Sequence, residues 1–246
     1  MDRSTERFAK WRFPVFLLAA TGLLAVSVGA GSNQNWGLLA VGIVLLAIIF
    51  LYRGFEKSRV STREIAIIAV LGAVAAVGRL PFAALPNIQP VTFLVIISGY
   101  VFGARAGFMI GSTAALVSNI FLGQGPWTPW QMFCWGLAGS SAALLKNVYL
   151  RGGRWSMVVF QFTWGYLFGW IMNLWFWTSF INPLTWQSFL VTYAASFWFD
   201  TCHAVGNVLF YLLFGAGVIK ILKRTKSKLE ISYLPAKDLG EPLLKN

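Results

Sequence analysis

The sequence predicts an all-α membrane protein with eight transmembrane helices, and three observations carry this prediction. Of the 246 residues, 57% are hydrophobic and only 11% are charged, about half the charged share of a soluble domain. The mean hydropathy is +0.67, and 12 Trp, 21 Phe and 7 Tyr residues would expose a large apolar surface if the chain faced water. The charges also lie between long apolar runs, each of which is a candidate span.

Eight apolar runs are interpreted as spans, because about 20 helical residues cross a hydrocarbon core of about 30 Å. They are residues 13–31, 36–52, 64–80, 91–104, 106–123, 130–146, 156–181 and 184–219. The first run follows a charged start, as in a signal peptide, but a second span follows soon after it. This favours a retained two-helix hairpin over a cleaved signal.

The hydrophilic linker 53–63 separates this hairpin from the rest of the chain. We therefore expect three parts, with a six-helix core in the middle. They are an N-terminal accessory transmembrane hairpin (1–59), the six-helix core (60–222) and a cytoplasmic tail (223–246).

The positive charges predict which side each loop occupies, because cytoplasmic flanks retain Lys and Arg during insertion. With the N-terminus inside, nineteen of the 20 basic residues fall on the cytoplasmic side, and Arg79 at the outer end of the third span is the exception. This predicts a multi-pass plasma-membrane protein with both termini in the cytoplasm. Because these flanks account for the net charge of +12, no nucleic-acid partner is expected.

Several kinds of chemistry are not expected. The chain has no GxxxxGK[ST] motif, so it is not expected to bind or hydrolyse ATP itself. Cys134 and Cys202 lie in apolar segments without metal-ligand spacing, so no metal site and no disulfide framework are predicted. An intramembrane enzyme acting on a lipid would need paired acids or a nucleophile with its base, which the sequence lacks. We predict no catalytic residue and no cofactor.

Arg79, Asp200 and His203 are the ionisable candidates for a site. Asp200 and His203 share one helix face, and an ionisable group within a span suggests function. The structural alternative is an ion pair between Asp200 and Arg79. As one helix, 184–219 would be about 54 Å long. If only about the last 20 residues of this run span the membrane, Asp200 is level with Arg79. If the helix enters the membrane at 185, Asp200 lies in the inner half of the membrane.

Three predicted outer segments are rich in Pro, Trp and amide side chains, namely 80–90, 123–130 and 181–187. An aromatic belt at the membrane interface explains most tryptophans of the chain. It explains 123–130 less well, because Pro126 and Pro129 stiffen the backbone beside two indoles. We expect this loop to hold both indoles over the outer mouth of the bundle.

The third span carries small residues at helical spacing. Ala69 and Ala73 form one A-x-x-x-A pair, and Gly72 and Ala76 form a second pair on the adjoining stripe. Such pairs let helices approach closely. The pattern leaves open whether the neighbouring helix belongs to this chain or to a partner.

Taken together, these residues resemble the substrate-binding S components of energy-coupling factor (ECF) vitamin transporters over about 60–222. The motifs that carry the resemblance are the Ala69/Ala73 pair, Gly99-Tyr-Val-Phe-Gly103 with Ala106-Gly-Phe108, and Ser118-Asn-Ile-Phe-Leu-Gly-Gln-Gly-Pro-Trp-Thr-Pro-Trp-Gln-Met132. The last motif is similar to the branch associated with cobalamin uptake. The N-terminal hairpin departs from the six-helix pattern of the family.

The resemblance implies a substrate pocket at the outer side, formed with the three segments named above, and a coupling-subunit contact at Ala69 and Ala73. The implied partners are a transmembrane coupling subunit, two ATPase subunits, a vitamin-like substrate and membrane lipid. ATP-driven motion of the coupling subunit would then tilt the S component in the membrane.

The expected pocket combines aromatic walls with a few polar groups. Its predicted residues are Arg79, Phe82, Asn87, Gln89, Trp127, Thr128, Trp130, Gln131, Asn173, Trp177, Asp200 and His203. Arg79 is expected to meet a phosphate or carboxylate, and Asp200 or His203 to orient an amide. The alternative function is a proton-coupled secondary transporter with Asp200 and His203 as its relay.

Overall fold

The computed structural model describes residues 36–56, 62–143 and 145–230. Within them every regular element is a helix. The elements are α2 (Trp36–Glu56), α3 (Thr62–Arg79), the short 3-10 helix η1 (Leu80–Phe82), α4 (Val91–Phe102), α5 (Ala104–Leu122), α6 (Thr128–Ala142), α7 (Leu145–Phe180) and α8 (Trp186–Glu230). The predicted first span 13–31 and most of the predicted tail lie outside the described residues.

Three helical segments of the described chain are long and apolar enough to cross a membrane, namely Thr62–Phe82, Ala104–Leu122 and Trp186–Lys228. The predicted all-helical membrane protein is confirmed at this level, but the count of eight spans is not. At 1.5 Å per residue, the 12 residues of α4 and the 15 of α6 extend about 18 and 22 Å, less than a hydrocarbon core of about 30 Å.

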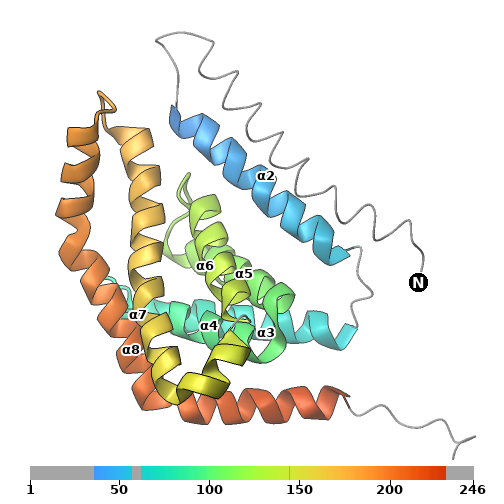
Figure 1. Ribbon diagram of the computed structural model, residues 1–246. Helices are drawn as coiled ribbons and strands as arrows, with labels where there is room; N and C mark the ends of the chain where they lie inside the picture. Colours follow the sequence, from blue (N-terminus) through green and yellow to red (C-terminus); the bar gives the residue numbers. More distant parts are fainter. Residues whose placement is uncertain (1–35, 57–61, 144, 231–246) are drawn as a thin grey trace, which may run out of the picture.

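The helices are arranged around a central group formed by α4, α5 and α6 (Figure 1). α7 and α8 pair as a long hairpin on one side of this group, and α2 lies on the other side. The 36 residues of α7 contain a break at Gly153, whose backbone (φ 55, ψ −146) leaves the helical region. α8 has 45 residues, about 68 Å of helix, and its last part turns along the bottom of the molecule (Figure 1).

Glycines allow α4, α5 and α6 to pack with their backbones almost in contact. A Cβ atom added at Gly99 of α4 or Gly107 of α5 would overlap the carbonyl oxygen of Gly139 in α6, and one at Gly111 would overlap that of Trp135. Two of these glycines lie in the motifs that carry the family resemblance. We call these close approaches the glycine seam, and they fix the distances between the three central helices.

α2 packs against the central helices through a small apolar cluster. Val44 and Ile48 of α2 are buried with Phe108 of α5 and Trp130 of α6. Tyr52 and Phe108 also pack edge to face, with 6.2 Å between the ring centroids. The second helix of the predicted hairpin is therefore in contact with the core.

The two small-residue pairs of α3 face in different directions. Gly72 is buried against α5, where an added Cβ would lie 2.8 Å from Cγ2 of Thr113, and Ala76 is also buried. Ala69 and Ala73, on the adjoining stripe, are exposed. The Gly72/Ala76 pair therefore packs within the chain, whereas the Ala69/Ala73 pair leaves a smooth outer face.

Candidate functional site

A cavity of about 460 Å³ lies between the segment after α3 and helices α6, α7 and α8, a volume typical of small-molecule sites. Half of the predicted pocket residues line it: Arg79, Asn87, Gln89, Gln131, Asn173 and Asp200. Of the three predicted outer segments, only 80–90 contributes to the lining. Asn87 adopts a left-handed backbone (φ 58), which Asn tolerates better than most residues, and its amide donates to the carbonyl of Phe199 at 3.2 Å.

Arg79 is held at the end of α3 by neutral hydrogen-bond acceptors. Its Nε donates to Oε1 of Gln89 at 2.7 Å, and Nη1 donates to Oγ of Ser118 at 2.9 Å and to Oδ1 of Asn119 at 2.8 Å. The guanidinium also lies over the Trp135 ring, 5.0 Å from its centroid. Because the guanidinium has five N–H donors, Nη2 keeps two that bond no described residue.

Asn119 connects Arg79 to the other polar side chains of a hydrogen-bond network. It is 1% exposed, and its Nδ2 donates to Oγ1 of Thr128 at 3.0 Å and to Oε1 of Gln131 at 2.8 Å. The Thr128 hydroxyl in turn donates to Oε1 of Gln124 at 2.9 Å. The polar residues of the loop and of α6 therefore orient Asn119, which presents its carbonyl oxygen to Arg79.

Asp200 lies on another wall of the same cavity. It is 2% exposed, and its Oδ2 accepts hydrogen bonds from Ser196 at 2.9 Å and Asn173 at 3.3 Å. Its carboxyl group also sits against Gly169 of α7, where an added Cβ would overlap it. Asp200 and Arg79 thus line the same cavity although the helix already begins at Trp186, and the depth of Asp200 in the membrane stays a prediction. No ion pair joins Asp200 to Arg79 in the described part of the chain.

His203 is buried behind the cavity rather than in its lining. Its Nε2 lies 2.8 Å from Oγ1 of Thr92, and the same oxygen accepts a hydrogen bond from Nε1 of Trp135 at 2.8 Å. Phe168 stacks on Trp135 and contacts the His203 ring, with centroid distances of 4.9 Å for both pairs. His203 is therefore linked to Trp135 through Thr92 and Phe168, which contact both residues. Among the described residues it makes no hydrogen bond with Asp200.

Four aromatic residues of the predicted pocket, and Thr128 described above, lie outside the cavity lining. Phe82 and Phe210 pack edge to face, with 5.2 Å between their ring centroids. Trp127 lies beside Trp175 at 6.1 Å. Their rings stabilise contacts between helices instead of facing the cavity.

The other two are Trp130 and Trp177. Trp130 is 5% exposed and is buried in the cluster formed with α2. Trp177 donates from Nε1 to Oγ of Ser188 at 2.9 Å, which ties α7 to the beginning of α8. The stiff loop with two indoles therefore contributes its polar residues to the Arg79 network, but not its rings to the cavity.

Sequence reasoning missed several residues of this site. Asn119 lies inside the most specific motif, and a polar amide within the apolar run 106–123 was a signal for it. Trp135 and Phe168 gave no such signal, because an aromatic residue in a span is as common in packing as in binding. Ser196 is one helical turn before Asp200, a spacing at which side chains meet.

Comparison with known proteins identifies the family. The family model described as ECF transporter, substrate-specific component, matches residues 63–225, more than half of the chain. The chain belongs to this family. The S component is therefore a non-catalytic transport subunit, as predicted, and its family implies an ECF module as partner and a small molecule as substrate. No curated protein and no solved structure matches the chain.

Replacing Asn119 by aspartate is expected to weaken substrate binding by about tenfold or more, because a carboxylate beside Arg79 would compensate its charge and compete with an anionic ligand. The measurement is the dissociation constant of the substrate for the purified S component. Asn182→Asp, an equal charge change in an exposed loop, is the control. Unchanged binding by Asn119→Asp would contradict a role for Arg79 in meeting an anion.

Proposed function

We propose that this S component captures a compact, vitamin-like micronutrient with an anionic group and delivers it to an ECF module. The observation that carries the proposal is Arg79. A charged group in a protein interior is costly unless an opposite charge compensates it, and the described partners of Arg79 are all neutral. A carboxylate or phosphate of the substrate would supply the missing charge and two acceptors for Nη2.

The other walls of the cavity suggest the remaining chemistry of the substrate. Asp200 faces the same space and accepts hydrogen bonds, so an amine or amide N–H of the ligand is a suitable partner. Trp135 and Phe168 both line the cavity and offer aromatic surface to a planar ring. We therefore infer a substrate that combines a ring, an anionic group and a hydrogen-bond donor.

The motif 118–132 resembles the family branch associated with cobalamin uptake, so cobalamin is included among the vitamins to be tested. The cavity of about 460 Å³ lies in the lower half of the range for ligand sites, about 300–1,000 Å³. This volume favours a compact vitamin over a whole corrinoid with its nucleotide tail. Cobalamin would require the 80–90 segment to move away from α8.

The test is a thermal-shift screen of the purified chain against a vitamin panel that includes cobalamin. A ligand at 100 times its dissociation constant stabilises the folded state by about 2.7 kcal/mol, which raises Tm measurably. We expect one anionic vitamin to stabilise the chain, and no ATP-driven uptake until the coupling subunit and both ATPase subunits are added. Stabilisation by no vitamin would contradict the proposal.

Replacing Ala69 and Ala73 by leucine is expected to spare vitamin binding and abolish uptake by the reconstituted transporter. Both alanines are exposed, and each is followed by an exposed valine, Val70 or Val74. Added side chains would hold the coupling subunit away from α3. The measurements are the Tm shift by the vitamin and ATP-dependent uptake. Leucine at two exposed alanines of α8, Ala194 and Ala195, is the control, and a loss of binding in the α3 variant would mean that the pair is an internal packing seam.

A proton-coupled secondary transporter that uses Asp200 and His203 is the second candidate function. It would transport in liposomes without an ATPase partner. The two side chains share a face of α8 but bond to different partners, Ser196 and Asn173 on one side and Thr92 on the other. This separation favours a binding role for Asp200 and a positioning role for His203.

A further inference from the structure

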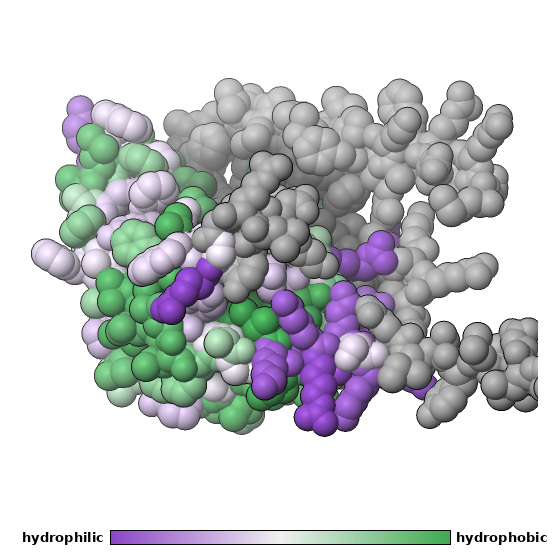
Figure 2. Space-filling model, turned by 60° about the horizontal axis from the view of Figure 1, so that its bottom comes forward, coloured by the Kyte–Doolittle hydropathy of each residue, from purple (hydrophilic) through white to green (hydrophobic). Residues whose placement is uncertain are grey.

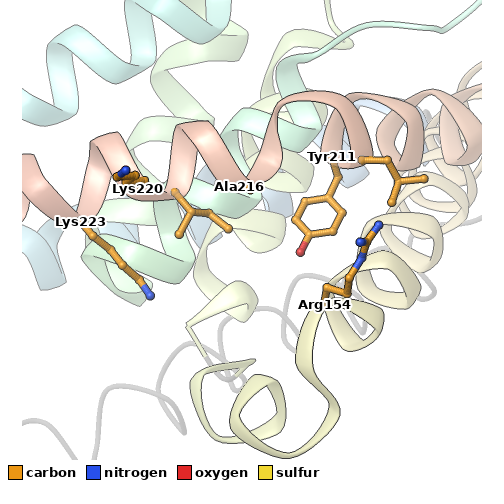
Figure 3. Close-up of a pocket in the computed structure, with 7 residues that line it drawn as sticks. Arg154, Tyr211, Ala216, Lys220 and Lys223 are labelled. Carbon is orange, nitrogen blue, oxygen red and sulfur yellow. The ribbon is translucent and has the colours of Figure 1, made fainter.

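A second cavity lies at the other end of the α7–α8 hairpin. It has a volume of about 450 Å³ and is formed by Arg154 of α7 and by residues of α8 between Tyr211 and Lys223. Lys220 is twenty residues beyond Asp200, about 30 Å along the helix. Figure 3 shows Arg154 pointing from α7 toward the Tyr211 ring. This pocket is therefore separate from the proposed substrate site.

The pocket concentrates positive charge. Arg154, Lys220 and Lys223 line it, and no carboxylate is among its described lining residues. Arg154 lies over the neighbouring Trp155 ring at 5.7 Å, and Lys223 lies over the Tyr100 ring at 5.7 Å. These ring contacts orient the two cationic side chains without neutralising their charge. Binding of an anion in the pocket would therefore be strongly favoured.

The rest of the lining is mainly apolar. Leu212, Ala216 and Ile219, together with the ring of Tyr211, complete the pocket. The surface beside it is apolar as well, because Leu213 is 72% exposed and Phe214 is 54% exposed. In a membrane protein such side chains face lipid tails. Figure 2 shows the boundary between the two kinds of surface, with hydrophilic residues gathered over the last part of α8 beside a broad hydrophobic area.

We propose that this pocket binds the phosphate of an anionic phospholipid, with the acyl chains along Leu212 and Ala216. Lys220 and Lys223 lie at one end of the pocket, the apolar side chains of Ala216 and Leu212 follow along α8, and Arg154 lies beside Tyr211 at the far end. The two lysines suit a phosphate, and the apolar stretch next to them suits acyl chains. A free phosphate would use the cations but gain nothing from the apolar part. The positive flanks of the chain predict that this is the cytoplasmic leaflet, whose basic pockets between helices bind anionic headgroups.

The test uses the full chain in neutral detergent and follows its Tm with increasing phosphatidylglycerol, phosphatidylcholine or inorganic phosphate. We expect phosphatidylglycerol to stabilise the protein at the lowest concentration. The double variant Lys220→Gln/Lys223→Gln is expected to bind this lipid about 30-fold more weakly, since each basic residue contributes about fivefold. Ala216→Trp, which fills the apolar part and keeps every charge, is expected to weaken binding as well.

The control is Arg224→Gln/Lys228→Gln, which removes the same charge from exposed positions of α8 outside the lining. It is expected to keep the affinity of the wild type within about twofold. An equal loss in this control would overturn the proposal in favour of general surface attraction. Stabilisation by inorganic phosphate as strong as that by phosphatidylglycerol, or equal stabilisation by phosphatidylcholine, would also overturn it.

Discussion

A Gly139→Val substitution is expected to leave little or no folded protein. Any side chain at Gly139 would overlap the carbonyl oxygen of Gly107, and a backbone atom cannot rotate away as a side chain can. Overpacking of a core costs about 1–3 kcal/mol when side chains give way, and here α5 and α6 would have to separate. The measurements are the yield of monodisperse protein in size-exclusion chromatography and its Tm.

Gly217→Val provides the matched control, because no atom of the described residues lies within 4 Å of a Cβ at this position of α8. It introduces the same β-branched residue into a helix and is expected to fold almost as well as the wild type. A Gly139→Val protein with an unchanged Tm would mean that the three central helices are not in close contact along the glycine seam.

An Arg79→Met substitution is expected to reduce affinity for the substrate by at least about 30-fold, which corresponds to the cost of about 2 kcal/mol or more for truncating one partner of a buried charge pair. Methionine keeps much of the length and packing of the side chain but removes the charge and the donors. The measurement is the dissociation constant of the vitamin that stabilises the wild type in the thermal-shift screen.

Two further variants show whether the effect belongs to the site. Arg79→Lys keeps the charge without the planar fork, so it is expected to bind with intermediate affinity. Arg105→Met makes the same change at an exposed arginine of α5 and is expected to bind normally. If Arg79→Met bound the vitamin as tightly as the wild type, the anionic group would have to be recognised elsewhere.

The apolar runs predicted the helices well because hydropathy is a property of each segment alone. The run 36–52 corresponds to Trp36–Glu56, and 64–80 corresponds to Thr62–Arg79. The charge pattern likewise singled out Arg79 and Asp200, which line one cavity. A costly ionisable group within a span is visible in the sequence before any neighbour is known.

The aromatic part of the site was harder to predict, because an indole or phenyl ring suits a binding wall and a helix contact equally well. Trp130 packs against α2, whereas Trp135, five residues later on the same helix, lines the cavity. Which of them faces the cavity depends on the rotation of α6. That rotation is fixed by Gly136 and Gly139 against α5, a constraint that becomes visible only when the helices are packed.

α3 carries both the proposed contact with the coupling subunit, at Ala69 and Ala73, and the proposed anion-binding group, the Arg79 guanidinium. Ala73 and Arg79 are six residues apart, about 9 Å along the axis, with regular helix between them. A partner that displaces the outer face of α3 would therefore move the guanidinium by the same distance, without an intervening hinge. Because Arg79 is also bonded to Asn119 at the end of α5, such a movement would strain the bonds that hold the substrate's charge. A force that the coupling subunit exerts on α3 would thus change the affinity of the site for its substrate.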